Sequence, residues 1–216
     1  MHLFMLKLDA RTKLLNAAIE VVRAQGYAAT SVDELCKKAG VTKGAFFHHF
    51  ESKDALAVAA ANHWSATTAA LFAGAAYHDH ADPLDRVLAY IALRRDLIQG
   101  APAEFSCFAG TTVQEAFATK DNIRAACEAS IFGHAETLVA DIAEAMRKYK
   151  VKGDWTPQSL ALHTQAVLQG AFILAKAKGD AAIARDSADH LYRYIQLLFQ
   201  PSRSKEGRHV RQGRNS

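Results

Sequence analysis

The chain has 216 residues, half of them apolar and 22% charged, which is a globular composition and excludes a wholly disordered protein. No apolar run approaches the ~18 residues that a membrane-spanning helix needs, and residues 1–8 lack the charged start and the cleavage site of a signal peptide. The three cysteines, Cys36, Cys107 and Cys127, are widely spaced and form no metal-binding pair. We therefore expect a cytoplasmic protein without a membrane segment, a metal site or a cofactor.

Charge is unevenly distributed along the chain. Residues 1–56 carry eight Lys/Arg against six Asp/Glu, residues 57–200 carry thirteen against fifteen, and residues 201–216 carry five against one. The last segment is basic and has only Val210 as a bulky apolar residue, so we expect a disordered tail. Such a tail can contact nucleic-acid phosphates, and a solvated tail without a role is the alternative.

Helical periodicity runs through the whole chain and predicts an all-α protein of about nine helices. Prolines and glycines stand where helices begin or end, and hydroxyl residues that can cap a helix, such as Ser31, Thr42 and Ser52, precede several of them. Three short helices are expected first, at about residues 9–25, 32–39 and 42–50. A larger bundle follows, with helices at about residues 52–77, 83–98, 104–117, 121–149, 157–178 and 182–199.

The first three predicted helices have the outline of a DNA-binding helix-turn-helix, with a tight turn at Gly40. In the third helix, Phe46 and Phe50 can face the first two helices. The opposite face carries Thr42, Lys43, Gly44, Phe47 and His48. An exposed phenylalanine beside cationic side chains fits a surface that enters a major groove, where Phe47 can pack on a thymine methyl group or a sugar.

Two segments, GYAATSVDEL at residues 26–35 and AGVTKGAFFHHFESKDAL at residues 39–56, strongly resemble the DNA-binding domain of the TetR/AcrR family of transcriptional regulators. The resemblance implies a helix-turn-helix domain over residues 1–56 and an effector-binding and dimerisation domain over residues 57–200. By position, it implies DNA contacts from Thr30, Ser31, Thr42, Lys43, Gly44, Phe47, His48, His49 and Lys53. Lys53 is expected to touch phosphate only.

This sequence departs from the family pattern at two positions. The family usually has a tyrosine, whose hydroxyl often bonds a phosphate, where Phe47 stands. His48 stands where a second aromatic residue is common, and His49 has an alternative role in closing the small core.

Late in the chain, apolar residues recur at steps of three and four in the helices expected at residues 121–149 and 182–199. Such seams are most often core within one chain, but the resemblance implies a homodimer formed by the late helices. The dimerisation candidates are Leu138, Ile142, Ile183, Leu191, Tyr194 and Leu198.

The resemblance also implies a small-molecule effector, bound in an apolar cavity among the middle helices. The effector-binding candidates are Phe72, Leu93, Leu97, Phe105, Phe108, Thr111, Gln114, Phe117, Ile131, His134, His163 and Phe172. For each aromatic residue, plain core packing is the alternative.

No catalytic motif of the GxSxG, Walker A or HExxH type is present, so we expect no enzyme. The sequence predicts a ligand-responsive regulator that binds a double-stranded DNA operator, a repressor released by a small apolar or amphipathic effector. Two alternatives stay open. One is a helical small-molecule-binding protein or enzyme with a structural N-terminal unit, and the other is a regulator switched by oxidation of Cys107.

Overall fold

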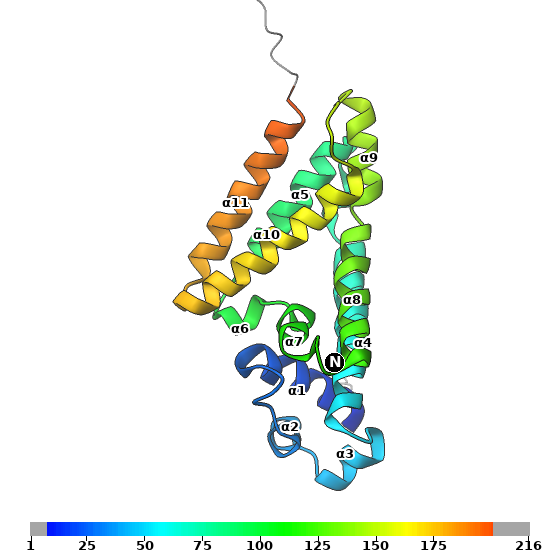
Figure 1. Cartoon of the computed structure of the whole chain (residues 1–216), viewed down its shortest axis with the longest axis vertical. Helices are drawn as coiled ribbons and strands as arrows, with labels where there is room; N and C mark the ends of the chain where they lie inside the picture. Colours follow the sequence, from blue (N-terminus) through cyan, green and yellow to red (C-terminus); the bar gives the residue numbers. More distant parts are fainter. Residues whose placement is uncertain (1–7, 201–216) are drawn as a thin grey trace, which may run out of the picture.

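The computed structural model describes residues 8–200, which form eleven α-helices, one short 3₁₀ helix and no strand (Figure 1). The predicted all-α fold is confirmed, and the predicted basic tail lies outside the described residues. None of the helices in residues 8–200 is long and apolar enough to cross a membrane. The elements are α1 (Ala10–Gln25), α2 (Val32–Ala39), α3 (Lys43–His49), α4 (Lys53–Ala73), η1 (Ala76–Asp79), α5 (Pro83–Asp96), α6 (Pro102–Phe105), α7 (Phe108–Ala116), α8 (Asp121–Glu136), α9 (Val139–Lys148), α10 (Pro157–Lys178) and α11 (Ala181–Leu198).

Two of the nine expected helices are each divided in two. The helix expected at residues 104–117 breaks into α6 and α7, because Ser106 and Cys107 adopt extended backbone. The helix expected at residues 121–149 breaks into α8 and α9, because the N–H of Leu138 bonds the carbonyl of Ala135 and tightens the turn. These two breaks account for eleven α-helices instead of nine.

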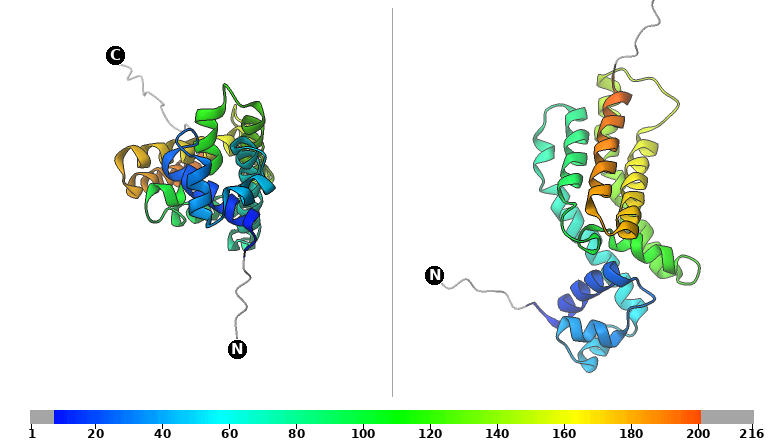
Figure 2. Two further views of the ribbon diagram at one scale, coloured as in Figure 1. Left: turned by 90° about the horizontal axis from the view of Figure 1, so that it is seen from below. Right: turned by 90° about the vertical axis from the view of Figure 1, so that its left-hand side faces the viewer.

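The helices α1 to α3 and the start of α4 form a small N-terminal unit at one end of the molecule (Figure 2). Its core contains Leu14, Leu35 and Phe46, each at most 1% exposed. The predicted capping box is present, since the Ser31 hydroxyl accepts from the N–H of Glu34 and the Glu34 carboxylate accepts from the N–H of Ser31.

The core of the N-terminal unit continues into the bundle. The buried cluster that contains Phe46 extends along α4 through Ala60 and Ala61, and reaches Phe108 on α7 and Ile123 on α8. A second cluster fills the space among α5, α9, α10 and α11. Packing is therefore continuous across residue 56.

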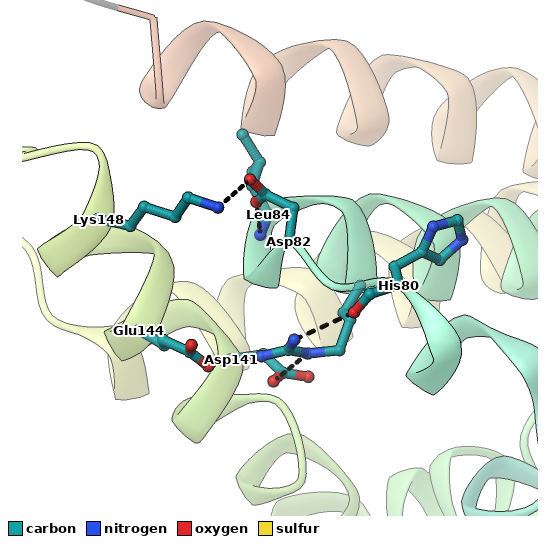
Figure 3. Close-up of polar contacts among 7 residues, drawn as sticks. His80, Asp82, Leu84, Asp141, Glu144 and Lys148 are labelled. Atoms are coloured by element: carbon teal, nitrogen blue, oxygen red, sulfur yellow. Dashed lines mark hydrogen bonds and ion pairs between the residues drawn. The ribbon is translucent and has the colours of Figure 1, made fainter.

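At the end farthest from the N-terminal unit, polar contacts tie α5 to α9 (Figure 3). The Arg86 guanidinium donates to Asp141 at 2.8 Å and to Glu144 at 2.5 Å. Asp82, the N-cap of α5, accepts from the Lys148 ammonium at 2.6 Å and from the N–H of Leu84 at 2.8 Å. It also accepts from the Tyr149 hydroxyl at 2.8 Å.

The contacts of Asp82 predict a loss of stability in acid. Burial opposes ionisation, but the hydrogen bonds from Lys148, Tyr149 and Leu84 outweigh it and lower the pKa of Asp82 to about 2. The ionised carboxylate therefore stabilises the fold above about pH 4, and this contribution is lost as the pH falls towards 2. We expect Asp82→Asn to lower the free energy of unfolding at pH 7 by about 1 to 2 kcal/mol, measured by urea denaturation.

The difference between wild type and Asp82→Asn should shrink towards zero between pH 4 and pH 2. A matched control for the loss of one negative charge is Asp186→Asn, on the exposed face of α11. A difference that stays constant from pH 7 to pH 2 would contradict the assigned pKa.

Candidate DNA-binding helix and effector cavity

The orientation of α3 is set by its cap and by two buried rings. The Thr42 hydroxyl accepts from the N–H of Ala45 at 3.1 Å, and Gly40 turns the chain before it with a φ of +64°. Phe46 is fully buried and Phe50 is 5% exposed, so one face of α3 is held against the rest of the unit. The other face of α3 is thereby presented outward at the tip of the molecule (Figure 1).

The outward face of α3 carries Lys43, Gly44, Phe47 and His48. The Phe47 ring is 56% exposed and meets the Phe46 ring edge-on, with 5.1 Å between the ring centres. Lys43 pairs with Asp33 at 2.7 Å, but both side chains are well exposed, so phosphate can replace the carboxylate at little cost. A Cβ added to Gly44 would meet only the Thr42 hydroxyl, at 3.8 Å, so the backbone here is open to close approach.

Three other residues that were predicted to contact DNA do not lie on the outward face of α3. Thr30 is 2% exposed and its hydroxyl donates to the carbonyl of Gly26, so this side chain is not available to phosphate. The Ser31 hydroxyl is exposed but engaged in the capping box. His49 is half-buried, with its ring against those of His48 and Phe50 at 4.9 and 6.4 Å.

Lys53 has a structural role that the sequence did not indicate. Its ammonium donates to the carbonyls of Tyr27 at 3.0 Å and Thr30 at 2.9 Å, and lies 4.3 Å from the centre of the Tyr27 ring. These bonds tie the start of α4 to the loop between α1 and α2. A phosphate contact would use the third N–H of the ammonium, and this contact stays a prediction.

We expect Lys53→Ala to destabilise the protein by about 1 to 3 kcal/mol, because two carbonyls lose a charged donor. Lys43→Ala is the matched control, and should leave the stability nearly unchanged since its ion pair is exposed. Urea denaturation measures both. Equal stability of the two variants would show that the Lys53 contacts do not hold the loop.

A cavity of about 210 Å³ lies among α4, α5, α8 and α10, with α1 and α6 closing one end. Six of the twelve predicted effector-binding residues line it, namely Phe72, Leu97, Phe105, Ile131, His134 and Phe172. Trp64, Arg94 and Gln165 also line it and were not predicted.

The remaining candidates lie elsewhere. Thr111 and Gln114 line a neighbouring hollow between α1, α7 and α10, which shares Phe172 with the cavity. Phe108 is fully buried in the cluster around Phe46, and Phe117 is 60% exposed. Leu93 packs against the core of the bundle, and the His163 ring meets that of Tyr194 edge-on at the outer face of α10 and α11. Phe108 and Leu93 therefore contribute to the packed core and do not line the cavity.

A polar network forms one end of the cavity. The Tyr90 hydroxyl accepts from Arg94 Nη1 at 2.9 Å and from Gln165 Nε2 at 3.1 Å. It lies 2.9 Å from His134 Nε2, which is 3.0 Å from Arg94 Nη1. Burial, with a smaller effect of Arg94, lowers the pKa of His134 to about 4. His134 is therefore neutral at pH 7, and the single lone pair of its Nε2 can accept from the Tyr90 hydroxyl or from Arg94 Nη1.

The opposite end of the cavity includes a residue of the N-terminal unit. Arg23 of α1 reaches in, and its guanidinium lies 5.1 Å from the centre of the Trp64 ring. Burial lowers the pKa of Arg23, and its Nε has no hydrogen-bond partner within residues 8–200. A ligand in this cavity would contact α1 directly.

The dimerisation candidates divide into buried and exposed residues. Leu138, Ile142 and Leu191 are at most 2% exposed in the core of a single chain, so they do not offer a surface to a second chain. Ile183 and Leu198 are half-buried, and Tyr194 is 44% exposed. The exposed apolar surface on α10 and α11 consists instead of Leu162, Ile173, Leu174, Tyr194 and Leu197.

Comparison with known proteins identifies the family. Residues 14–60 match the model of the bacterial regulatory proteins of the tetR family, and residues 83–191 match a tetracyclin repressor-like C-terminal domain. The transcriptional regulator AcuR of Cereibacter sphaeroides is 28% identical over 171 residues, which cover 77% of this chain and 76% of AcuR.

Solved structures agree with this match. A TetR-family regulator from Agrobacterium tumefaciens superposes with a TM-score of 0.76 at 21% identity, over 86% of this chain and 97% of that one. A TetR regulator from Chloroflexus aurantiacus has a TM-score of 0.73 at 25% identity, over 87% of this chain and 94% of that one. The chain therefore belongs to the TetR family, whose members are ligand-responsive, DNA-binding transcriptional regulators.

Proposed function

We propose that this protein is a homodimeric repressor that binds a two-fold symmetric operator through α3, and that a small amphipathic effector in the cavity releases it. The observation that carries the proposal is the placement of Arg23. This residue belongs to α1, the supporting helix of the DNA-binding unit, and it lines the cavity formed by the bundle. One residue of the N-terminal unit, Arg23, therefore belongs to the lining of the proposed effector site.

Other contacts join the same two parts. Glu115 of α7 accepts from the N–H of Ala28 at 2.6 Å, and Lys120 pairs with Asp54 of α4 at 2.7 Å. An effector that fits the cavity only when α1 and α7 are displaced would favour a spacing of the two α3 helices that no longer matches the operator. Release requires that the effector bind this displaced state more tightly than the state that fits the operator.

A dimer is supported by the exposed apolar face on α10 and α11. Leu174 is 57% exposed and Leu197 is 63% exposed, and the small residues Ala166 and Gly170 on α10 allow a second helix to approach closely. Of these two helices, α11 lies at the edge of the bundle away from α4 and α8, and α10 runs beside it (Figure 1). Two-fold pairing here would place two α3 helices on successive half-sites.

Leu174→Glu is expected to weaken the dimer at least about tenfold, because each protomer would bring a charge into the apolar interface. Phe132→Glu is the matched control, since Phe132 is 55% exposed on α8, outside this face. Sedimentation velocity over a concentration series measures both. A dimer unaffected by Leu174→Glu, or broken by Phe132→Glu, would place the interface elsewhere.

Fluorescence anisotropy tests the proposal as a whole. The labelled duplex would carry the DNA upstream of the coding region, an unrelated duplex of equal length would compete, and the salt concentration would be varied. We expect binding that survives the competitor and weakens steeply with salt. Equal, salt-insensitive affinity for both duplexes would favour a helical binding protein or enzyme with a structural N-terminal unit. The named relatives are transcriptional regulators, which supports the first outcome.

A further inference from the structure

We infer that the effector is an organic monoanion, with a carboxylate-type head group bound by Arg94 and an apolar body that extends along α4 towards Trp64. This inference rests on the proposed function, because it names the class of ligand that the cavity takes.

The three arginines of α5 provide an internal comparison. Arg86 pairs with Asp141 and Glu144, and Arg95 pairs with Asp189 and Asp96. Within residues 8–200, Arg94 has no carboxylate within ion-pair distance, although it is half-buried and lines the cavity. A partly buried cation without a counter-charge is costly, and an anion supplied by the ligand would remove that cost.

The guanidinium of Arg94 is held in place by neutral groups. It lies 5.5 Å from the centre of the Phe72 ring and 5.8 Å from that of Tyr90. Its hydrogen bonds to other described residues both use Nη1, and they go to the Tyr90 hydroxyl and His134 Nε2. The Nε and Nη2 groups form the edge that binds a carboxylate with two parallel hydrogen bonds.

The surroundings of Arg94 favour an anion over a cation. The network consists of Tyr90, Gln165 and neutral His134, so the only formal charge among these residues is that of Arg94. A cationic head group would be repelled here. A neutral amide would leave the charge of Arg94 unmatched.

The rest of the cavity suits an apolar body. Trp64, Leu71 and Phe72 line it from α4, and residues 64 to 72 span roughly 12 Å of helix. Phe105 and Phe172 face them from α6 and α10. At the far end, Arg23 and Glu104 both line the cavity, so that end carries both signs of charge. A second anionic group on the ligand would meet the Glu104 carboxylate as well as the Arg23 guanidinium, so this end offers it no net positive charge, which favours a monoanion.

The test is calorimetric titration of the full chain, without DNA, with matched ligands that differ only in the head group. The probes are hexanoate and benzoate as anions, hexanamide and benzamide as neutral analogues, and hexylammonium and benzylammonium as cations, each up to 10 mM. We expect at least one anion to bind at least about tenfold more tightly than its amide and its ammonium analogue. Equal or weaker binding of both anions, or no binding by any probe, overturns the inference.

Two variants assign the preference to Arg94. Arg94→Gln should bind the anion and its amide within about threefold of each other. Arg94→Lys keeps the charge but lacks the planar edge with two donors, so it should retain part of the preference. Binding of the amide by Arg94→Gln shows that this variant keeps its cavity. Arg95→Gln is the matched control, since its partner Asp189 lies outside the cavity, and should behave as wild type. A preference that survives Arg94→Gln overturns the inference.

A second readout separates this inference from the proposed function. If an anion binds through Arg94 but does not release operator DNA in the anisotropy assay, the head-group assignment stands and effector-driven release fails. If a neutral or cationic probe releases the DNA through this cavity while both anions do not, release stands and the head-group assignment fails.

Discussion

Replacing Phe47 with alanine is expected to weaken operator binding about 100-fold while leaving the thermal stability unchanged. The ring is 56% exposed and lies on the outward face of α3, so its removal leaves no cavity in the fold. In the complex, it would pack on a thymine methyl group or a sugar. A loss of about 1.4 kcal/mol of binding free energy per half-site lowers the affinity about tenfold. Because the dimer contacts two half-sites, the expected loss is about 100-fold. Anisotropy titration of the operator measures the effect.

Two variants control this prediction. Phe47→Tyr keeps the ring and adds a hydroxyl that can bond a phosphate, so its affinity should equal or exceed that of wild type. Phe46→Ala alters the neighbouring ring, which is fully buried, and should lower the free energy of unfolding by about 3 to 5 kcal/mol. If Phe47→Ala binds DNA as wild type does, α3 does not enter the groove by this face.

Gly26→Ala is expected to lower the free energy of unfolding by about 2 to 3 kcal/mol. Gly26 ends α1 with a φ of +92°, a conformation in which any Cβ is strained. The added Cβ would also lie 2.3 Å from Glu115 Oε1, so the carboxylate must move and release the N–H of Ala28. The variant should melt roughly 4 to 12 °C lower, as measured by circular dichroism.

Gly40→Ala is the matched control for this prediction. Gly40 also has a positive φ, +64°, but an added Cβ meets nothing within 4 Å, so the expected cost is about 1 kcal/mol. Glu115→Ala removes the contact with Ala28 without backbone strain, and its effect on DNA release shows how far this contact couples α7 to the DNA-binding unit. Equal melting temperatures for Gly26→Ala and Gly40→Ala would contradict the larger cost expected at Gly26.

Local chemistry explains which features could be predicted from the sequence. Helix caps depend on residues three apart, and Ser31, Thr42 and Ser52 all accept the expected backbone N–H bonds. The outward face of α3 follows from helical spacing, because Phe46 is buried and Phe47 is exposed.

Features that depend on distant contacts could not be predicted in this way. An arginine on a helix normally indicates a solvated face. Arg94 instead lines a cavity, because His134 of α8 and Gln165 of α10 pack beside it in the folded chain. The breaks between α6 and α7 and between α8 and α9 have no proline or glycine at the break itself. The apolar seam predicted for the last helix contains both core and surface positions, since Leu191 is buried and Tyr194 is 44% exposed.

Selection of bound duplexes from a library of random DNA sequences tests sequence-specific DNA recognition most directly, because it needs no prior operator. The full chain would be used, with Phe47→Ala in parallel. We predict enrichment of one two-fold symmetric sequence by the wild type and its loss or strong reduction with the variant. Recovery of unrelated sequences by both proteins, with no motif after repeated rounds, would contradict the account.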